Sequence, residues 1–168
     1  MKQGEKGFTL VEVVVGLAIM AIIIGPITVT TATMVKNYAQ AAEQNIVLPR
    51  VQNAGYWISR DVQMASGITP GDPNGFPLSL DIPIDEDPNN DYGIEYLFDG
   101  NKLKRKVYDS SQTLVSETLI ADYIDTDNTT FSTVDAITGH YKLTVTAAED
   151  VAQATRSYEI KQRISLGY

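Results

Sequence analysis

Hydrophobic and polar positions divide the chain into a polar start, a long apolar run, a helical stripe and a series of short alternating segments. Residues 1–7 are polar, and the 20 residues from Phe8 to Ile27 contain a single charged residue, Glu12. At about 1.5 Å per residue, this run matches the roughly 30 Å hydrocarbon core of a bilayer. A helix that is apolar all round has no polar face for water, so a core helix of a soluble protein does not fit. We therefore expect residues 8–30 to span a membrane.

The helical pattern continues beyond this apolar run. Residues 38–45 are rich in Ala, Gln and Glu, and apolar or small residues then recur at spacings of four, three, four and three. That spacing predicts a helix with one face packed on a globular domain, with Arg60 and Asp61 off the packed face. The helix should extend to residue 66. The stripe consists of Val51, Gly55, Ile58, Val62 and Ala65.

Two prolines fall inside the predicted helix. Gly25-Pro26 lies near the far end of the apolar run, where proline removes an amide donor and crowds the carbonyl of Ile22. We expect a kink at Gly25 and Pro26 and a second bend at Pro49. Ser66-Gly67 and the turn residues 70–73 should end the helix.

Beyond the helix the period changes from helical to alternating. Asp99-Gly100-Asn101 supplies the positive-φ positions that a tight hairpin needs, so the segments on either side should pair as antiparallel strands. The pattern predicts an α+β fold, with the long N-terminal helix packed on a single antiparallel β-sheet domain of residues 67–168. The predicted strands are residues 77–84, 93–98, 103–108, 141–146 and 158–164.

Charge and cysteine content exclude several classes of function. The formal net charge is −8, whereas nucleic-acid binding needs clustered Lys and Arg, so no nucleic-acid partner is expected. The chain contains no cysteine, which excludes disulfides, thiolate metal sites and a thiol nucleophile.

The charges beside the apolar run indicate its orientation. Lys2 and Lys6 precede the run, and basic residues favour the cytoplasmic side. We expect a single-pass protein of the cytoplasmic (inner) membrane, with residues 31–66 and the β domain outside the cytoplasm.

The residues at the start of the run carry a family resemblance. Gly7-Phe8-Thr9-Leu10-Val11-Glu12, after a short basic leader, resembles the prepilin cleavage and methylation motif of type IV pilins and type II secretion pseudopilins. The resemblance implies a leader peptide of residues 1–7, cleavage by prepilin peptidase between Gly7 and Phe8, and N-methylation of Phe8. It also implies an inner-membrane assembly platform and other pilin or pseudopilin subunits as partners.

Glu12 is a carboxylate within the apolar run. A charged side chain in lipid costs on the order of 3 kcal/mol, so it is normally paired or functional. The resemblance implies a salt bridge to the N-terminal amine of Phe8 in a neighbouring subunit, which would set the register of assembly. The alternative is that Glu12 reaches the cytoplasmic headgroups from one turn inside the helix.

A second resemblance covers more of the chain with less specific residues. The layout of this chain resembles that of minor pseudopilins of the J type. Its shared features are an Arg-Asp pair late in the helix, an aromatic hairpin and an Arg on a final strand. The matching residues are Arg60, Asp61, Tyr96, Phe98, Gly100, Leu103 and Arg163.

Candidate ligand sites are few. Asp85, Asp87, Asn89 and Asp91 concentrate oxygen ligands for Ca²⁺, but the loop lacks the Gly and Glu of an EF-hand, which favours a solvated acidic loop. Asp122, Asp125, Asp127 and Asn128 form a second acidic group, interpreted as turn residues. His140 is the only histidine, and Trp57 is expected to pack on the domain. We expect no cofactor.

Two classes of function remain. The first is a structural subunit, a minor pseudopilin or pilin, of a type IV pilus-like or type II secretion filament. The alternative is a membrane-tethered ligand-binding module or enzyme with its site in the β domain, for which the sequence offers no nucleophile and base pair and no phosphate loop. We therefore predict a non-enzymatic protein.

Overall fold

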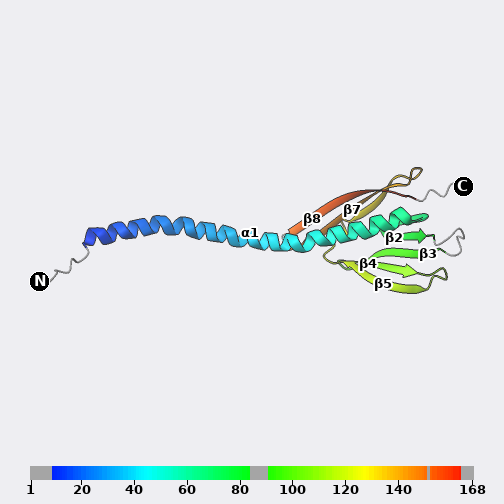
Figure 1. Cartoon of the computed structure of the whole chain (residues 1–168), viewed down its shortest axis with the longest axis horizontal. Coiled ribbons are helices and arrows are strands. Elements are labelled where there is room, and N and C mark those ends of the chain that lie inside the picture. The colour runs from blue at the N-terminus through cyan, green and yellow to red at the C-terminus, as the bar shows by residue number, and fades with distance from the viewer. Residues whose placement is uncertain (1–8, 84–90, 151, 164–168) are drawn as a thin grey trace. The chain divides into compact units, whose positions relative to one another are not determined.

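The computed structural model describes residues 9–83, 91–150 and 152–163 (Figure 1). The chain forms two compact units, residues 1–41 and residues 42–168. One helix, α1 (Leu10–Met64), contributes to both units, and the eight strands belong to the second.

The predicted helix of residues 8–66 is confirmed. Helix α1 begins at Leu10 and ends at Met64, two residues inside the predicted bounds. It continues without interruption through Pro26 and Pro49, so neither proline ends it. It ends at Met64, before Ser66 and Gly67, where the Ser66 amide donates to the Asp81 carbonyl (2.8 Å). The chain thus leaves the helix directly into pairing with a strand.

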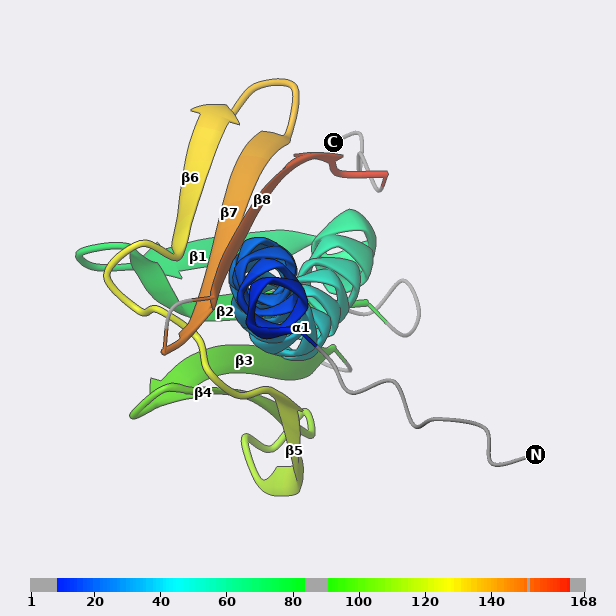
Figure 2. The ribbon, with the colours of Figure 1, turned by 90° about the vertical axis from the view of Figure 1, so that its left-hand side faces the viewer.

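The strands form two antiparallel sheets, which the sequence pattern did not separate (Figure 2). The first is a meander of β1 (Gly67–Gly71), β2 (Gly75–Ile82), β3 (Tyr92–Asp99), β4 (Lys102–Tyr108) and β5 (Leu114–Ala121). The second contains β6 (Thr130–Asp135), β7 (His140–Glu149) and β8 (Ala152–Lys161). The predicted α+β class with antiparallel strands is confirmed.

Individual strands agree with the prediction to different degrees. The hairpin of β3 and β4 closes through the Asp99–Lys102 pair, and Gly100 has φ 60°, as the turn requires. The sequence did not predict β1, β5 or β6. Residues 67–71, expected to be a helix stop only, pair with β2 along the edge of the sheet, where the exposed Pro70 needs no amide partner.

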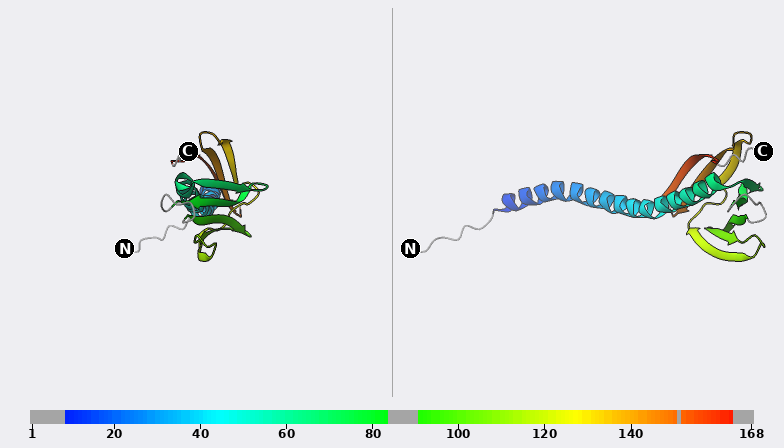
Figure 3. Two further views of the ribbon diagram at one scale, coloured as in Figure 1. Left: turned by 90° about the vertical axis from the view of Figure 1, so that its right-hand side faces the viewer. Right: turned by 45° about the vertical axis from the view of Figure 1, so that its right-hand side comes forward.

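The second part of α1 packs against both sheets. Figure 3 shows the strands of the two sheets on different sides of this part of the helix. The stripe residues Val51, Ile58, Val62 and Ala65 are fully buried, as predicted, in one core with residues of both sheets. The strand residues fully buried in that core include Leu78, Tyr96 and Leu103 from the first sheet and Leu143, Val145 and Ala147 from the second.

Candidate functional site

The first turn of α1 is closed by a capping box. Thr9 precedes the helix, and its backbone amide and hydroxyl both donate to Glu12 Oε2, at 3.0 and 2.9 Å. In return the Glu12 amide donates to Thr9 Oγ1 at 3.3 Å. A Thr at the N-cap and a Glu three residues later satisfy two free amides of the first turn in this way. The Glu12 carboxylate therefore has partners within its own chain.

The residues of the predicted cleavage site, Gly7 and Phe8, lie outside the described residues. Cleavage between them, methylation of Phe8 and the salt bridge from Glu12 remain predictions. Among the ion pairs that the described residues form, none includes Glu12.

Apolar side chains cover the helix from Leu10 to Tyr38 on all sides. An 18-residue window within this 29-residue stretch has a mean hydropathy of 2.6, and none of the stretch is buried within the chain. Its large apolar side chains expose between 51% and 80% of their surface. A helix of this length and composition is able to cross a membrane. An exposed apolar surface of this extent indicates contact with lipid or with other proteins.

The turn after Pro26 is held by threonine hydroxyls. Thr28 Oγ1 donates to the Ile24 carbonyl and Thr30 Oγ1 to the Pro26 carbonyl, both at 2.8 Å, and Thr31 and Thr33 repeat the pattern one turn on. Such bonds often accompany a bend, but the kink at Gly25 and Pro26 stays a prediction.

A buried polar cluster joins α1 to the first sheet. Asp61 is 1% exposed, and Asp61 Oδ2 accepts hydrogen bonds from Tyr96 Oη (2.6 Å) and Arg105 Nε (2.7 Å). The prediction that Asp61 lies off the packed face is therefore wrong. Asp61 shares the buried face with Ile58 because residues three apart on a helix are neighbours.

This cluster has an electrostatic signature. Burial, and then the Asp61 carboxylate, raise the pKa of Tyr96 well above its ordinary value, so its hydroxyl stays protonated and donates. A carboxylate and a guanidinium buried together are stable only when both are paired and hydrogen-bonded. The cluster thus fixes α1 on strands β3 and β4.

The sequence did contain a signal for this cluster. Arg105 alternates with Leu103 and Val107 on β4, and it lies opposite Tyr96 in the β3–β4 register. Alternation therefore places Arg105 on the face that carries Leu103, where it requires an acidic partner. Trp57 packs partly buried against the core, as predicted, with the Arg60 and Arg105 guanidinium groups 5.4 and 5.5 Å from its ring centroid.

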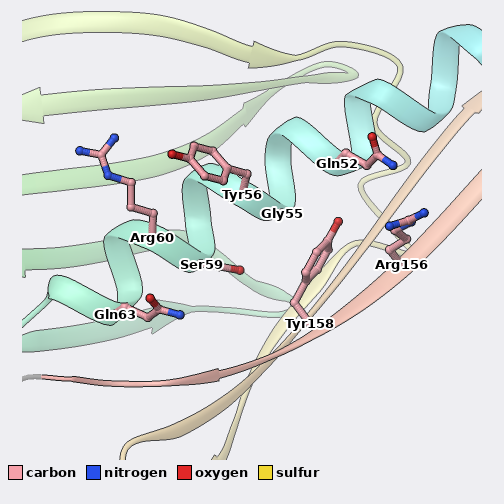
Figure 4. Close-up of a pocket in the computed structure, with 8 residues that line it drawn as sticks. All are labelled: Gln52, Gly55, Tyr56, Ser59, Arg60, Gln63, Arg156 and Tyr158. Carbon is pink, nitrogen blue, oxygen red and sulfur yellow. The ribbon is translucent and has the colours of Figure 1, made fainter.

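An open groove of about 450 Å³ lies between α1 and β8 (Figure 4). We call it the α1–β8 groove. On its floor a Cβ added to Gly55 would lie 2.1 Å from the Tyr158 ring, so only glycine allows this close approach. Its lining consists of Gln52, Gly55, Tyr56, Ser59, Arg60, Gln63, Arg156 and Tyr158.

The other candidate residues occupy turns or ion pairs. Asp125 accepts hydrogen bonds from the amide and side chain of Asn128, and the side-chain bond holds the pKa of Asp125 below its usual value. Asp122 forms an ion pair with Arg50 (2.6 Å), and His140 Nε2 lies within hydrogen-bonding distance of Glu159 Oε2 (2.9 Å).

Neither the favoured solvated acidic loop nor the calcium alternative is tested. Asp85, Asp87 and Asn89 lie outside the described residues, whereas Asp91 is described and approaches Ser66 Oγ at 3.4 Å. Within residues 9–83, 91–150 and 152–163, no three His, Cys, Asp or Glu side chains gather closely enough to hold a metal ion.

Comparison with known proteins adds one finding. The profile of the prokaryotic N-terminal methylation motif matches residues 2–28. No curated protein and no solved structure shows significant similarity to the chain.

The methylation motif and the long apolar helix together support a type IV pilin or pseudopilin, a class whose members are structural proteins. Within that class the motif is that of a prepilin, the precursor that prepilin peptidase processes. The motif and the apolar helix near the N-terminus also fit a single-pass inner-membrane protein.

Proposed function

We propose that the chain is a structural subunit, a minor pseudopilin or pilin, of a type IV pilus-like or type II secretion filament. Prepilin peptidase cleaves it after Gly7 and methylates Phe8, and the processed subunit then resides in the inner membrane. An assembly platform extracts it from there into the filament, and the protein catalyses no reaction itself.

The observation that carries this proposal is the exposed apolar surface from Leu10 to Tyr38, which begins within the methylation motif matched at residues 2–28. Lipid covers that surface before assembly, and the helices of neighbouring subunits cover it afterwards. The association is favourable because helices of neighbouring subunits can pack closely and satisfy a polar group that lipid leaves unpaired. Lys2 and Lys6 keep the N-terminus in the cytoplasm, and the two sheets lie outside it.

Glu12 supplies the polar group in this scheme. In the isolated chain its carboxylate is held by Thr9, which lowers the cost of keeping it in the membrane. In the filament it meets the Phe8 amine of a neighbour. Two unit charges about 4 Å apart attract by roughly 4 kcal/mol at an effective dielectric of 20, which offsets much of the burial cost.

A Glu12→Gln variant tests this role. Glutamine can replace glutamate in a capping box, so the helix start is kept while the charge is lost. We expect the variant to be processed and membrane-bound, with a yield of crosslinks to other pilin-like subunits at least about tenfold lower, which corresponds to 1.4 kcal/mol. Because the chain has no cysteine, a single cysteine at Val13 gives crosslinking without background.

Thr9→Ala is the matched control, because it removes the capping hydroxyl and keeps the charge of Glu12. It should lose less crosslinking than Glu12→Gln. If Glu12→Gln crosslinks as well as the wild type, the paired-charge role is wrong and contact with the headgroups explains Glu12.

A further inference from the structure

The α1–β8 groove differs in charge from the rest of the chain. Its eight lining residues include two arginines, Arg60 and Arg156, and no carboxylate, in a chain of net charge −8. Both arginines are exposed, and neither forms an ion pair with another described residue. In Figure 4 Arg156 lies at the Gln52 end of the groove and Arg60 at the Gln63 end.

Arg156 breaks the side-chain alternation of β8. Ala152 and Ile160 of the same row are buried, and Ala154 and Tyr158 pack partly buried against the core. All the remaining positions of this row hold apolar or aromatic residues. A cation at its centre therefore makes the strand less stable than an apolar residue there would. Residues that break a local rule in this way are often functional.

Strand β8 is also the edge of its sheet, with β7 as its hydrogen-bonded neighbour. Directly after β8 the chain is held at the C-terminal end of α1, since the Arg163 amide donates to the Gln63 carbonyl (3.0 Å) and Gln162 Nε2 to the Ala65 carbonyl. From Ala154 to Tyr158 no backbone partner besides β7 is found among the described residues. An extended segment can bind such an edge through main-chain hydrogen bonds.

We infer that the α1–β8 groove docks an extended acidic segment of a neighbouring subunit. Arg156 and Arg60 bind its carboxylates at the two ends, and the Gln52 and Gln63 amides beside them bind its peptide groups. This inference rests on the proposed function only in identifying the partner as a neighbouring subunit. A protein segment fits better than a simple anion because the two cations lie at opposite ends of a groove lined by neutral amides. Arginine also suits the planar carboxylate.

Fluorescently labelled hexaglutamate is the probe, titrated against the purified full chain in mild detergent and followed by anisotropy. We expect saturable binding that weakens with salt, and no binding of hexaglutamine. Arg156→Gln should raise the dissociation constant about tenfold, as the loss of one charge-assisted contact predicts, and Arg60→Gln should raise it as well. Lys161→Gln is the control, because it removes an exposed cation from the same strand outside the groove.

Three results would overturn the inference. The first is no hexaglutamate binding, or binding that Arg156→Gln leaves unchanged. The second is displacement of hexaglutamate by inorganic phosphate at equal concentration, which would leave a simple anion site. The third is self-association of the Arg156→Gln variant, seen by light scattering. That result would mean that Arg156 prevents edge-to-edge pairing of β8 rather than binding a partner. The assay needs no filament, so it can fail or succeed independently of the Glu12 test.

Discussion

Residues 10–41 and residues 42–64 lie on one helix, yet their apolar side chains have different surroundings. In the first stretch every large apolar side chain is exposed, whereas in the second Val47, Val51, Ile58 and Val62 are fully buried among strands of their own chain. The sequence differs accordingly, with apolar residues on all sides of the first stretch and on one stripe of the second. A helix that is apolar on all sides must therefore be covered on all sides, whereas a helix with one apolar stripe needs to be covered only on that face.

The same difference applies to polar groups. In the second stretch Asp61 is buried by its own chain and paired with Arg105, so the pair acts in folding. In the first stretch Glu12 has only Thr9 as its partner among the described residues. In the proposed function this charge acts in assembly rather than in folding.

The largest effect should follow loss of the Asp61 carboxylate. Asp61→Ala leaves the largely buried Arg105 without its partner, and we expect a loss of about 3–5 kcal/mol in the free energy of unfolding. Urea unfolding in detergent, followed by the fluorescence of Trp57, measures it, since Trp57 is the only tryptophan. Asp99→Ala, which breaks an exposed pair with Lys104 (2.8 Å), should cost less than about 1 kcal/mol. Equal losses for the two variants would remove the special role of Asp61.

A charge in the first stretch should affect the membrane rather than folding. Ile23→Lys puts a cation near the middle of the apolar segment, which costs about 3 kcal/mol on insertion scales. We expect less protein in the membrane fraction after carbonate extraction. Ile137→Lys is the control, since Ile137 is 97% exposed on a turn of the second unit. If both variants are retained alike, lipid does not surround the first stretch.

A smaller effect should distinguish the glycines of the two stretches. Gly55→Val forces the Tyr158 ring away from α1 and disrupts its hydrogen bond to the Val51 carbonyl (3.3 Å). We expect a loss of about 1–3 kcal/mol in the same unfolding assay. Gly16→Val meets no heavy atom within 4 Å and should leave the unfolding of the second unit unchanged. A neutral Gly55→Val would show that helix and strand are loosely packed there.

Sequence reasoning succeeded where a pattern depends on neighbours along the chain. The helix, its buried stripe and the Asp99-Gly100 hairpin follow from periodicity and turn chemistry. It missed β1, β5 and β6, which depend on partners distant in sequence. Residues 114–119 of β5 are exposed on both faces, so no alternation marks them. β1 is a short edge that exists because β2 pairs with it.

The candidate sites divide in the same way. The methylation motif is contiguous and could be found in the sequence, and its match to residues 2–28 agrees. The Asp61 cluster and the α1–β8 groove bring together residues from α1 and from strands 35 or more positions away. Only the alternation of Arg105 with Leu103 and Val107 on β4 could have indicated a buried acid, and the prediction from the sequence did not use it.

The mature N-terminus tests the central claim most directly. Intact-mass and peptide mass spectrometry of the chain, purified from membranes of cells that contain a prepilin peptidase, should show a chain that begins at Phe8 and carries a methyl group on its amine. Replacement of Gly7 by leucine should leave the precursor uncut in the same membranes. A wild-type chain that keeps Met1 in those membranes would contradict the assignment as a prepilin.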